Sequence, residues 1–171
     1  MLGGPSIRFG DNVNTDVIIP GRYLVSIDPV ELAEHAFEPL GPEVQQAVRR
    51  SKVIVAGKNF GCGSAREQAA SCLVGAGIEV VLARSFARVF YRNAINTGLP
   101  AIALGDDVDV IGDDAEVLVD LEAGEVRSGE ATVAFPPFPA SLRRILDAGG
   151  LIPYLARHVV GTPSPAGTVG R

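Results

Sequence analysis

The most restrictive feature of this sequence is a loop at residues 57–67, GKNFGCGSARE, which contains three glycines. An apolar run at residues 52–56 precedes it and favours a buried strand, and an alanine-rich run at residues 69–74 follows it and favours a packed helix. Free N–H groups and the dipole at the start of such a helix attract anions, and glycine lets the backbone come close to a ligand. Arg66 can bind a carboxylate or a phosphate through two hydrogen bonds. The sequence therefore predicts an anion site at this loop.

The composition is that of a globular chain. Its 171 residues are 47% hydrophobic and 20% charged, and we expect one domain at residues 1–160 followed by a disordered tail at 161–171. The net charge of −5 argues against a nucleic-acid surface, because phosphate contacts need a basic excess. No apolar run reaches about 18 residues, so no membrane span is expected. Cys62 and Cys72 make a poor disulfide framework, which favours a reduced, cytoplasmic setting.

The order of the expected elements indicates an α/β fold with a mixed sheet and flanking helices. Residues 52–83 predict a parallel strand-helix-strand unit, and Asp28, Pro29 and Glu31 predict a helix start with a capping box. Residues 117–120 and 131–135 predict antiparallel strands joined by a turn at 122–125. The other expected elements are a strand at 6–9, a short apolar run at 17–19, helices at 42–50, 85–97, 141–148 and 153–160, and a solvated acidic connection at 106–114. The helix at 85–97 is expected to bury Phe86, Val89, Phe90 and Ile95.

The known nucleotide-binding loops do not fit residues 57–67. A Walker A loop carries its lysine at the end, whereas Lys58 stands at the start, and a dinucleotide fingerprint needs a third glycine where Arg66 stands. Ser64 has two interpretations. With Glu67 it fits a Ser-x-x-Glu capping box, which is a structural role, and beside Arg66 it is a candidate catalytic hydroxyl. The spacing alone leaves both open.

A catalytic Ser64 needs help from outside this chain. A helix N-terminus contributes at most about 2 kcal/mol, or roughly 1.5 pK units, which does not make a serine hydroxyl a base at neutral pH. The substrate proton must be made acidic by an electrophile, and two cysteines are too few to hold an iron–sulfur cluster. His35 and His158 lack metal-ligand spacing. We therefore expect no metal site on this chain and a partner that brings the metal.

Three motifs in the same order, at residues 10–16, 57–69 and 83–93, resemble the small subunit of 3-isopropylmalate dehydratase, in the compact form shared with homoaconitase small subunits. The resemblance covers about residues 6–155. It implies the swivelling β/β/α domain of the aconitase superfamily. It also implies a heterodimer with a large subunit that carries a [4Fe-4S] cluster, with the active site where the two chains meet and a small hydroxy-diacid as substrate.

The resemblance assigns roles to residues around the glycine-rich loop. Ser64 matches the serine that removes the substrate proton, and Arg66 matches the arginine that binds a substrate carboxylate. Asp16 matches the aspartate of the family's Thr-Asp motif, which supports that site. The family often has a second serine where this chain has Ala65, so one hydrogen bond to the substrate is expected to be missing.

A second substrate-facing segment is implied at Tyr23, Leu24, Val25 and Ser26. In the family this loop faces the variable γ group of the substrate, and homoaconitases carry an arginine at its third position. Val25 at that position prefers an apolar group, because an unpaired carboxylate against valine is costly. This favours an isopropyl-bearing or methyl-bearing malate over homocitrate.

The sequence thus predicts the small subunit of a hydro-lyase that isomerises 2- and 3-isopropylmalate in leucine biosynthesis. Two alternatives among enzymes stay open: a dimethylmalate or methylmalate dehydratase, and a homoaconitase small subunit. A catalytically inactive anion-binding module also stays open, and Ala65 is its support.

Overall fold

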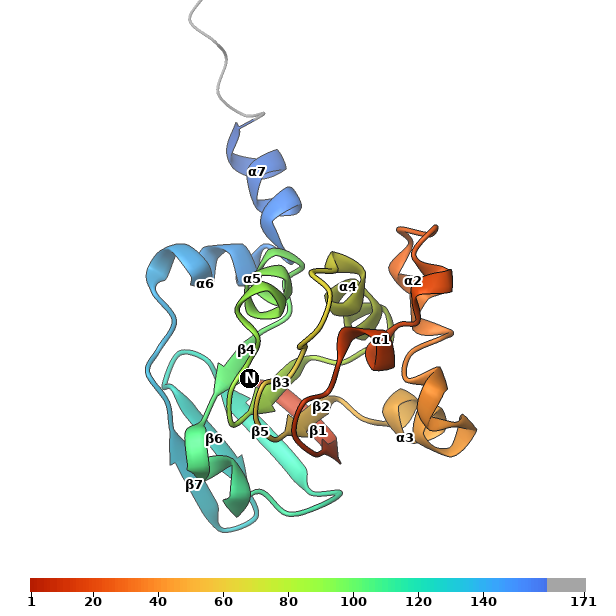
Figure 1. Ribbon diagram of the computed structural model, residues 1–171. Coiled ribbons are helices and arrows are strands. Elements are labelled where there is room, and N and C mark those ends of the chain that lie inside the picture. Colours follow the sequence, from red (N-terminus) through yellow and green to blue (C-terminus); the bar gives the residue numbers. More distant parts are fainter. Residues whose placement is uncertain (160–171) are drawn as a thin grey trace, which may run out of the picture.

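The computed structural model describes residues 1–159, which build one seven-stranded mixed sheet in the order β4-β3-β2-β1-β5-β6-β7 (Figure 1). Strands β1 to β4 are parallel to one another, and β5 to β7 continue the sheet in antiparallel fashion from β1. The strands are β1 (Leu2–Phe9), β2 (Val53–Ala56), β3 (Val80–Ala83), β4 (Ala101–Ala103), β5 (Glu116–Asp120), β6 (Glu125–Ser128) and β7 (Ala131–Ala134).

Strand β1 joins the two halves of the sheet. Its first half pairs with β5 in antiparallel register, with Leu2 opposite Val119, and its second half pairs with β2 in parallel register, with Phe9 opposite Ala56. One strand therefore carries the chain from the antiparallel part to the edge where the parallel strands end.

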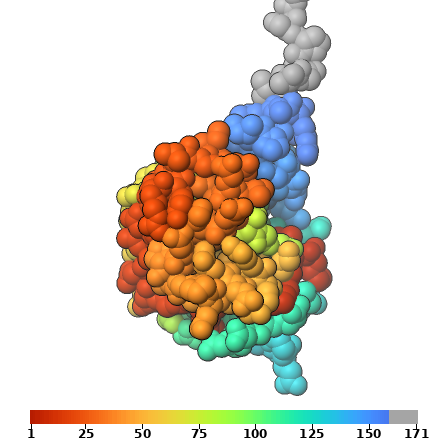
Figure 2. Space-filling view, turned by 90° about the vertical axis from the view of Figure 1, so that its right-hand side faces the viewer, coloured from red at the N-terminus to blue at the C-terminus, as the bar shows by residue number. Residues whose placement is uncertain are grey.

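The helices lie mainly around the parallel strands, and Figure 1 shows α4 and α5 on the side away from the β6–β7 hairpin. The α-helices are α1 (Thr15–Ile18), α2 (Pro29–Ala33), α3 (Pro42–Arg50), α4 (Glu67–Gly75), α5 (Arg88–Asn96), α6 (Ala140–Asp147) and α7 (Leu151–Val159). Three short 3-10 helices are η1 (Gly21–Tyr23), η2 (Glu38–Leu40) and η3 (Gly105–Val110). In the space-filling view, the orange segment with α2 and α3 forms a broad face and α7 projects beyond the body (Figure 2).

Both faces of the parallel strands are buried, and the alternation along β2 shows how. Ile54 and Ala56 pack into a cluster with the helices, whereas Val53 and Val55 pack into a second cluster with β5, β6, β7 and η3. All four β2 residues are fully buried. The continuous apolar run that predicted this strand is thus explained by cover on two sides.

Most of the predicted elements are confirmed. The parallel strand-helix-strand unit forms, the helix at Pro42–Arg50 has the predicted bounds, and strand β1 contains the predicted segment. Asp28 caps α2 by accepting from the Val30 N–H at 2.8 Å. The predicted return of Glu31 to this cap is wrong, because its carboxylate accepts from the Ser26 hydroxyl instead.

Two other predictions are corrected by the structure. The predicted turn at 122–125 leads into an unforeseen strand, β6, which lies between β5 and β7. The helix predicted from residue 85 begins at Arg88, and Val89 is 42% exposed. The apolar run at 17–19 lies in and after the short helix α1, and the acidic connection begins with η3, whose exposed Asp106 and Asp109 pair with Arg84. The tail at 161–171 lies outside the described residues.

Candidate active site

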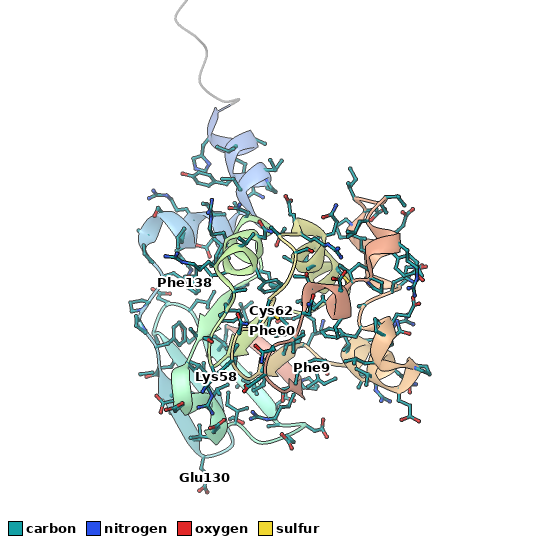
Figure 3. All side chains as sticks on the ribbon, in the orientation of Figure 1. Phe9, Lys58, Phe60, Cys62, Glu130 and Phe138 are labelled. Carbon is teal, nitrogen blue, oxygen red and sulfur yellow. The ribbon has the colours of Figure 1, made fainter. Side chains whose placement is uncertain are left out.

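The loops that follow β1, β2 and β3 lie side by side at the edge where the parallel strands end. The middle loop, residues 57–66, carries the glycines, and Lys58, Phe60 and Cys62 mark its course in Figure 3. It is bonded to its neighbours on both sides, through Gly61 N–H to Val13 C=O at 2.8 Å and through Phe60 N–H to Ser85 C=O at 3.0 Å. The glycine-rich segment is therefore a fixed part of the fold.

Two glycines of this loop combine a positive φ with no room for a Cβ. Gly61 has φ +77°, and a Cβ there would lie 2.1 Å from Cγ of the buried Phe90. Gly63 has φ +95°, and a Cβ there would lie 2.4 Å from Oδ1 of Asn14. The left-handed conformation and the close neighbours both require glycine.

Ser64 is exposed, and its structural interpretation is wrong. Helix α4 begins at Glu67, with Arg66 as an extended N-cap residue that makes no side-chain cap hydrogen bond. Because Arg66 is extended, the helix starts two residues later than a capping box at Ser64 requires. The Ser64 hydroxyl is left at the surface, beside the equally exposed Ala65.

Arg66 is held beside this serine by an ion pair with Asp16, a residue 50 positions away in the sequence. The Arg66 side chain is only 20% exposed, and Asp16 is 53% exposed. A Cβ on Gly21 would lie 3.6 Å from both terminal nitrogens of Arg66, so the guanidinium lies against this glycine. The arrangement places an oriented guanidinium two residues from an open hydroxyl, which suits the binding of a carboxylate.

Asp16 is positioned by the start of α1. The Asn14 side chain caps this helix by accepting from the Asp16 N–H at 2.9 Å, and the same side chain lies against Gly63. Sequence reasoning singled out Asp16 but missed Asn14, Thr15 and Gly21, which hold the site together. The available signal was the motif at residues 10–16, whose polar residues suit a loop that bonds to another loop.

The predicted substrate-facing segment is anchored at Tyr23. The Tyr23 hydroxyl donates to Oε2 of Glu38 at 2.7 Å, and its ring stacks on His35 with centroids 3.5 Å apart. The bond from Tyr23 is the main cause that lowers the pKa of Glu38 below its ordinary value, and hydrogen bonds from His35 and Arg22 add to it. A rigid group of four side chains therefore fixes one end of this segment.

Beyond Tyr23 the segment reaches the surface. Val25 is 95% exposed, Leu24 packs partly against the core, and Ser26 donates to Glu31 at 2.6 Å. An open hollow of about 430 Å³ is lined by Tyr23, Val25, Ser26, Glu31, Leu32, Glu34 and His35. Neither Ser64 nor Arg66 lines it. The structure thus brings Asp16 to Arg66, whereas Tyr23, Val25 and Ser26 border a separate hollow.

The described part of the chain does not fit an iron–sulfur cluster. Within residues 1–159 no three His, Cys, Asp or Glu side chains come together as metal ligands. Burial raises the pKa of the Cys72 thiol to about 12, and its Sγ lies 3.4 Å from the Leu32 carbonyl, so this residue stays a packed thiol. Cys62 is half-buried on the glycine-rich loop. A cluster needs several thiolates, and these residues do not supply them.

No helix among residues 1–159 is long and apolar enough to span a membrane.

The comparisons with known proteins are consistent with one another. Residues 38–106 match the family described as the aconitase C-terminal domain. The chain is 47% identical over 157 residues to a 3-isopropylmalate dehydratase small subunit from Saccharolobus islandicus, covering 92% of this chain and 95% of that protein. This chain belongs to the 3-isopropylmalate dehydratase small-subunit family. It is also 51% identical over 161 residues to small subunit 1 of the dehydratase from Methanopyrus kandleri, covering 92% of this chain and 94% of that protein.

The fold of this small-subunit family is confirmed by a solved structure. A crystal structure of 3-isopropylmalate dehydratase from Methanocaldococcus jannaschii superposes with a TM-score of 0.85 at 43% identity, covering 93% of this chain and 95% of that one. The resemblance inferred from three motifs and the aconitase-type α/β domain are therefore correct. The family is one of small subunits, so a large-subunit partner belongs with this chain.

Proposed function

We propose that this chain is the small subunit of a hydro-lyase that interconverts 2- and 3-isopropylmalate by dehydration and rehydration, as a step in leucine biosynthesis. The observation that carries the proposal is the exposed Ser64 beside the Asp16–Arg66 pair, in a chain that aligns over 92% of its length with proteins named as small subunits of this dehydratase. A serine released from helix capping is available for chemistry.

In this proposal Ser64, Arg66 and Asp16 each have one task. The Ser64 oxygen accepts the proton from the carbon of the substrate, and the Arg66 guanidinium holds a carboxylate and so fixes the substrate near that oxygen. Asp16 holds Arg66 in place through the ion pair. Ala65 offers no hydroxyl at the position where the family often has a second serine, so its backbone N–H is the polar group left there.

The electrophile comes from the partner in this account. We propose that the large subunit carries a [4Fe-4S] cluster, which supplies Lewis-acid chemistry at the leaving hydroxyl. The described residues of this chain hold no ligands for it, so their share is limited to binding, orientation and proton removal. A cytoplasmic setting suits the two free thiols, Cys62 and Cys72.

The surroundings of Val25 favour an apolar γ group on the substrate. Val25 is 95% exposed and lines a hollow together with Glu31 and Glu34. The nearby cation Arg22 is already paired with Glu38. A second substrate carboxylate beside Val25 would meet an apolar side chain, with Glu31 and Glu34 as like charges nearby, which disfavours homocitrate.

The test is an assay of the chain reconstituted with its large subunit on isopropylmalate, dimethylmalate, citraconate and homocitrate. We expect the highest kcat/KM on isopropylmalate and no turnover of homocitrate. Preferred turnover of homocitrate would contradict the substrate assignment. Tight binding of a hydroxy-diacid by the isolated chain, with no turnover in the reconstituted pair, would support the inactive anion-binding module instead.

A further inference from the structure

We propose that Thr15 is a positioning residue for the catalytic loop: its buried hydroxyl holds the Ser64 carbonyl and thereby turns the Ser64–Ala65 peptide toward the substrate. Thr15 is 1% exposed and its Oγ1 lies 3.1 Å from the Ser64 carbonyl oxygen. A hydroxyl has one proton to donate, and its other neighbour, Oδ1 of Asn14, is at the longer distance of 3.5 Å. The inference rests on the proposed role of Ser64.

The Thr15 contact is the last of a row of bonds between two loops. The Asn12 N–H donates to the Lys58 carbonyl at 2.7 Å and the Thr15 N–H donates to the Cys62 carbonyl at 2.8 Å. These bonds extend the parallel pairing of β1 and β2 beyond the ends of both strands. At Ser64 the backbone ladder ends, and a side-chain hydroxyl takes the place of the next backbone donor. The Thr15 hydroxyl therefore makes the last bond before the loop separates from the edge of the sheet.

The direction of one peptide follows from this bond. The described residues contain no cis peptide, and in a trans peptide the C=O of Ser64 and the N–H of Ala65 point in opposite directions. With the carbonyl directed at buried Thr15, the Ala65 N–H is directed away from the core. This N–H has no protein acceptor among residues 1–159, and both residues of the peptide are exposed. It is available to a carboxylate or oxyanion of the substrate.

Thr15 is also next to Asp16, which pairs with Arg66. One short segment thus fixes the peptide after the serine through Thr15 and the carboxylate-binding guanidinium through Asp16. Loss of the Thr15 hydroxyl would leave the ion pair in place but free the peptide that carries Ser64. We therefore expect a defect in kcat more than in KM.

The experiment compares Thr15→Val and Thr15→Ser in the reconstituted complex. Valine keeps the shape and loses the hydroxyl, and serine keeps the hydroxyl. We expect Thr15→Val to lower kcat by about tenfold or more, since small displacements of reacting groups have effects of this size, with KM within about twofold. Thr15→Ser should restore kcat to within about threefold of the unmodified enzyme. The isotope effect on kcat, measured with substrate deuterated at the carbon that loses its proton, should rise in Thr15→Val.

Ser51→Ala is the matched control. Ser51 is 5% exposed and its hydroxyl donates to the Ala47 carbonyl at 2.8 Å, but this residue lies before β2, at the opposite end of that strand from the catalytic loop. The Ser51→Ala variant should lower thermal stability about as much as Thr15→Val and should leave kcat and the isotope effect unchanged.

Three outcomes overturn the positioning role. These are an unchanged kcat in Thr15→Val, equal losses in Thr15→Val and Thr15→Ser, or an equal kcat loss in Ser51→Ala. If Thr15→Val does not assemble with its partner, Thr15→Ala takes its place. An unchanged kcat in Thr15→Ala, or equal kcat losses in Thr15→Ala and Thr15→Ser, then overturns the positioning role. Activity retained in Ser64→Ala would refute the proposed function, whereas activity retained in Thr15→Val alongside an inactive Ser64→Ala refutes only this inference.

Discussion

Replacing Gly63 by alanine tests the packing of the glycine-rich loop against the start of α1. Gly63 has φ +95°, and the conformational cost for alanine at positive φ is about 1–2 kcal/mol. The three atoms that its Cβ would meet all belong to the Asn14 side chain, at 2.4 to 2.8 Å. Asn14 must move away and leave the Asp16 N–H uncapped, which costs about 1 kcal/mol. The sum for Gly63→Ala is about 2–3 kcal/mol.

A double-mutant cycle separates these two terms. Asn14→Ala alone removes the cap and should cost about 1 kcal/mol. In its background Gly63→Ala meets no Asn14 atoms and should cost only the backbone term of about 1–2 kcal/mol. The double mutant should therefore be about 1 kcal/mol more stable than the sum of the two single effects. Urea denaturation measures all three free energies of unfolding.

The matched control for the backbone term is Gly149→Ala. Gly149 has φ +82°, and a Cβ there would have no neighbour within 4 Å. This substitution should cost about 1–2 kcal/mol. A Gly63→Ala effect no larger than that of Gly149→Ala, or strict additivity with Asn14→Ala, would refute the reasoning.

Two further predictions concern charged side chains. Arg66→Lys should lower kcat/KM on isopropylmalate by about 10- to 100-fold, because a lysine does not form the paired hydrogen bonds of a guanidinium; an unchanged kcat/KM would show that Arg66 does not touch the substrate. The pKa of Glu38 is lowered from 4.5 by the bond from Tyr23, so its stabilising contribution is present above that pH and is lost as the pH falls through the lowered pKa. Glu38→Gln should flatten the acid side of the stability curve, and parallel curves for both proteins would contradict the assignment.

Local signals predicted the elements that depend on neighbouring residues. Asp28 followed by Pro29 marked the start of α2, and Pro42 marked the start of α3. The apolar run of β2 was recognisable because both of its faces are covered. These features arise from capping, proline geometry and burial, which the sequence carries within a few residues.

Some features were missed because the local pattern did not identify the partner. Ser64 and Glu67 match a capping box, but the Thr15 N–H and hydroxyl donate to the Cys62 and Ser64 carbonyls, and the helix begins only at Glu67. The apolar run at 17–19 was assigned to no element, and the Asn14 cap begins α1 at Thr15. Strand β6 was hidden because Glu125, assigned to a turn, pairs with Asp120. Only the first of these involves a contact with a distant part of the chain.

For the candidate site, the sequence identified the main residues but not the contacts between them. Ser64 and Arg66 were identified from the loop motif, and the resemblance added Asp16. The ion pair between Arg66 and Asp16 could not be read from spacing, because it joins residues 50 apart through the pairing of two loops. Gly21, which lies against the guanidinium, has no local signature at all.

The most direct test of the account is the turnover of isopropylmalate by the complex reconstituted with Ser64→Ala. The Ser64 side chain is exposed and its backbone holds the contact to Thr15, so alanine should leave the fold and the assembly with the large subunit intact. If this hydroxyl removes the substrate proton, kcat should fall by at least about 100-fold. A Ser64→Ala complex that turns over isopropylmalate at the unmodified rate would contradict the central claim.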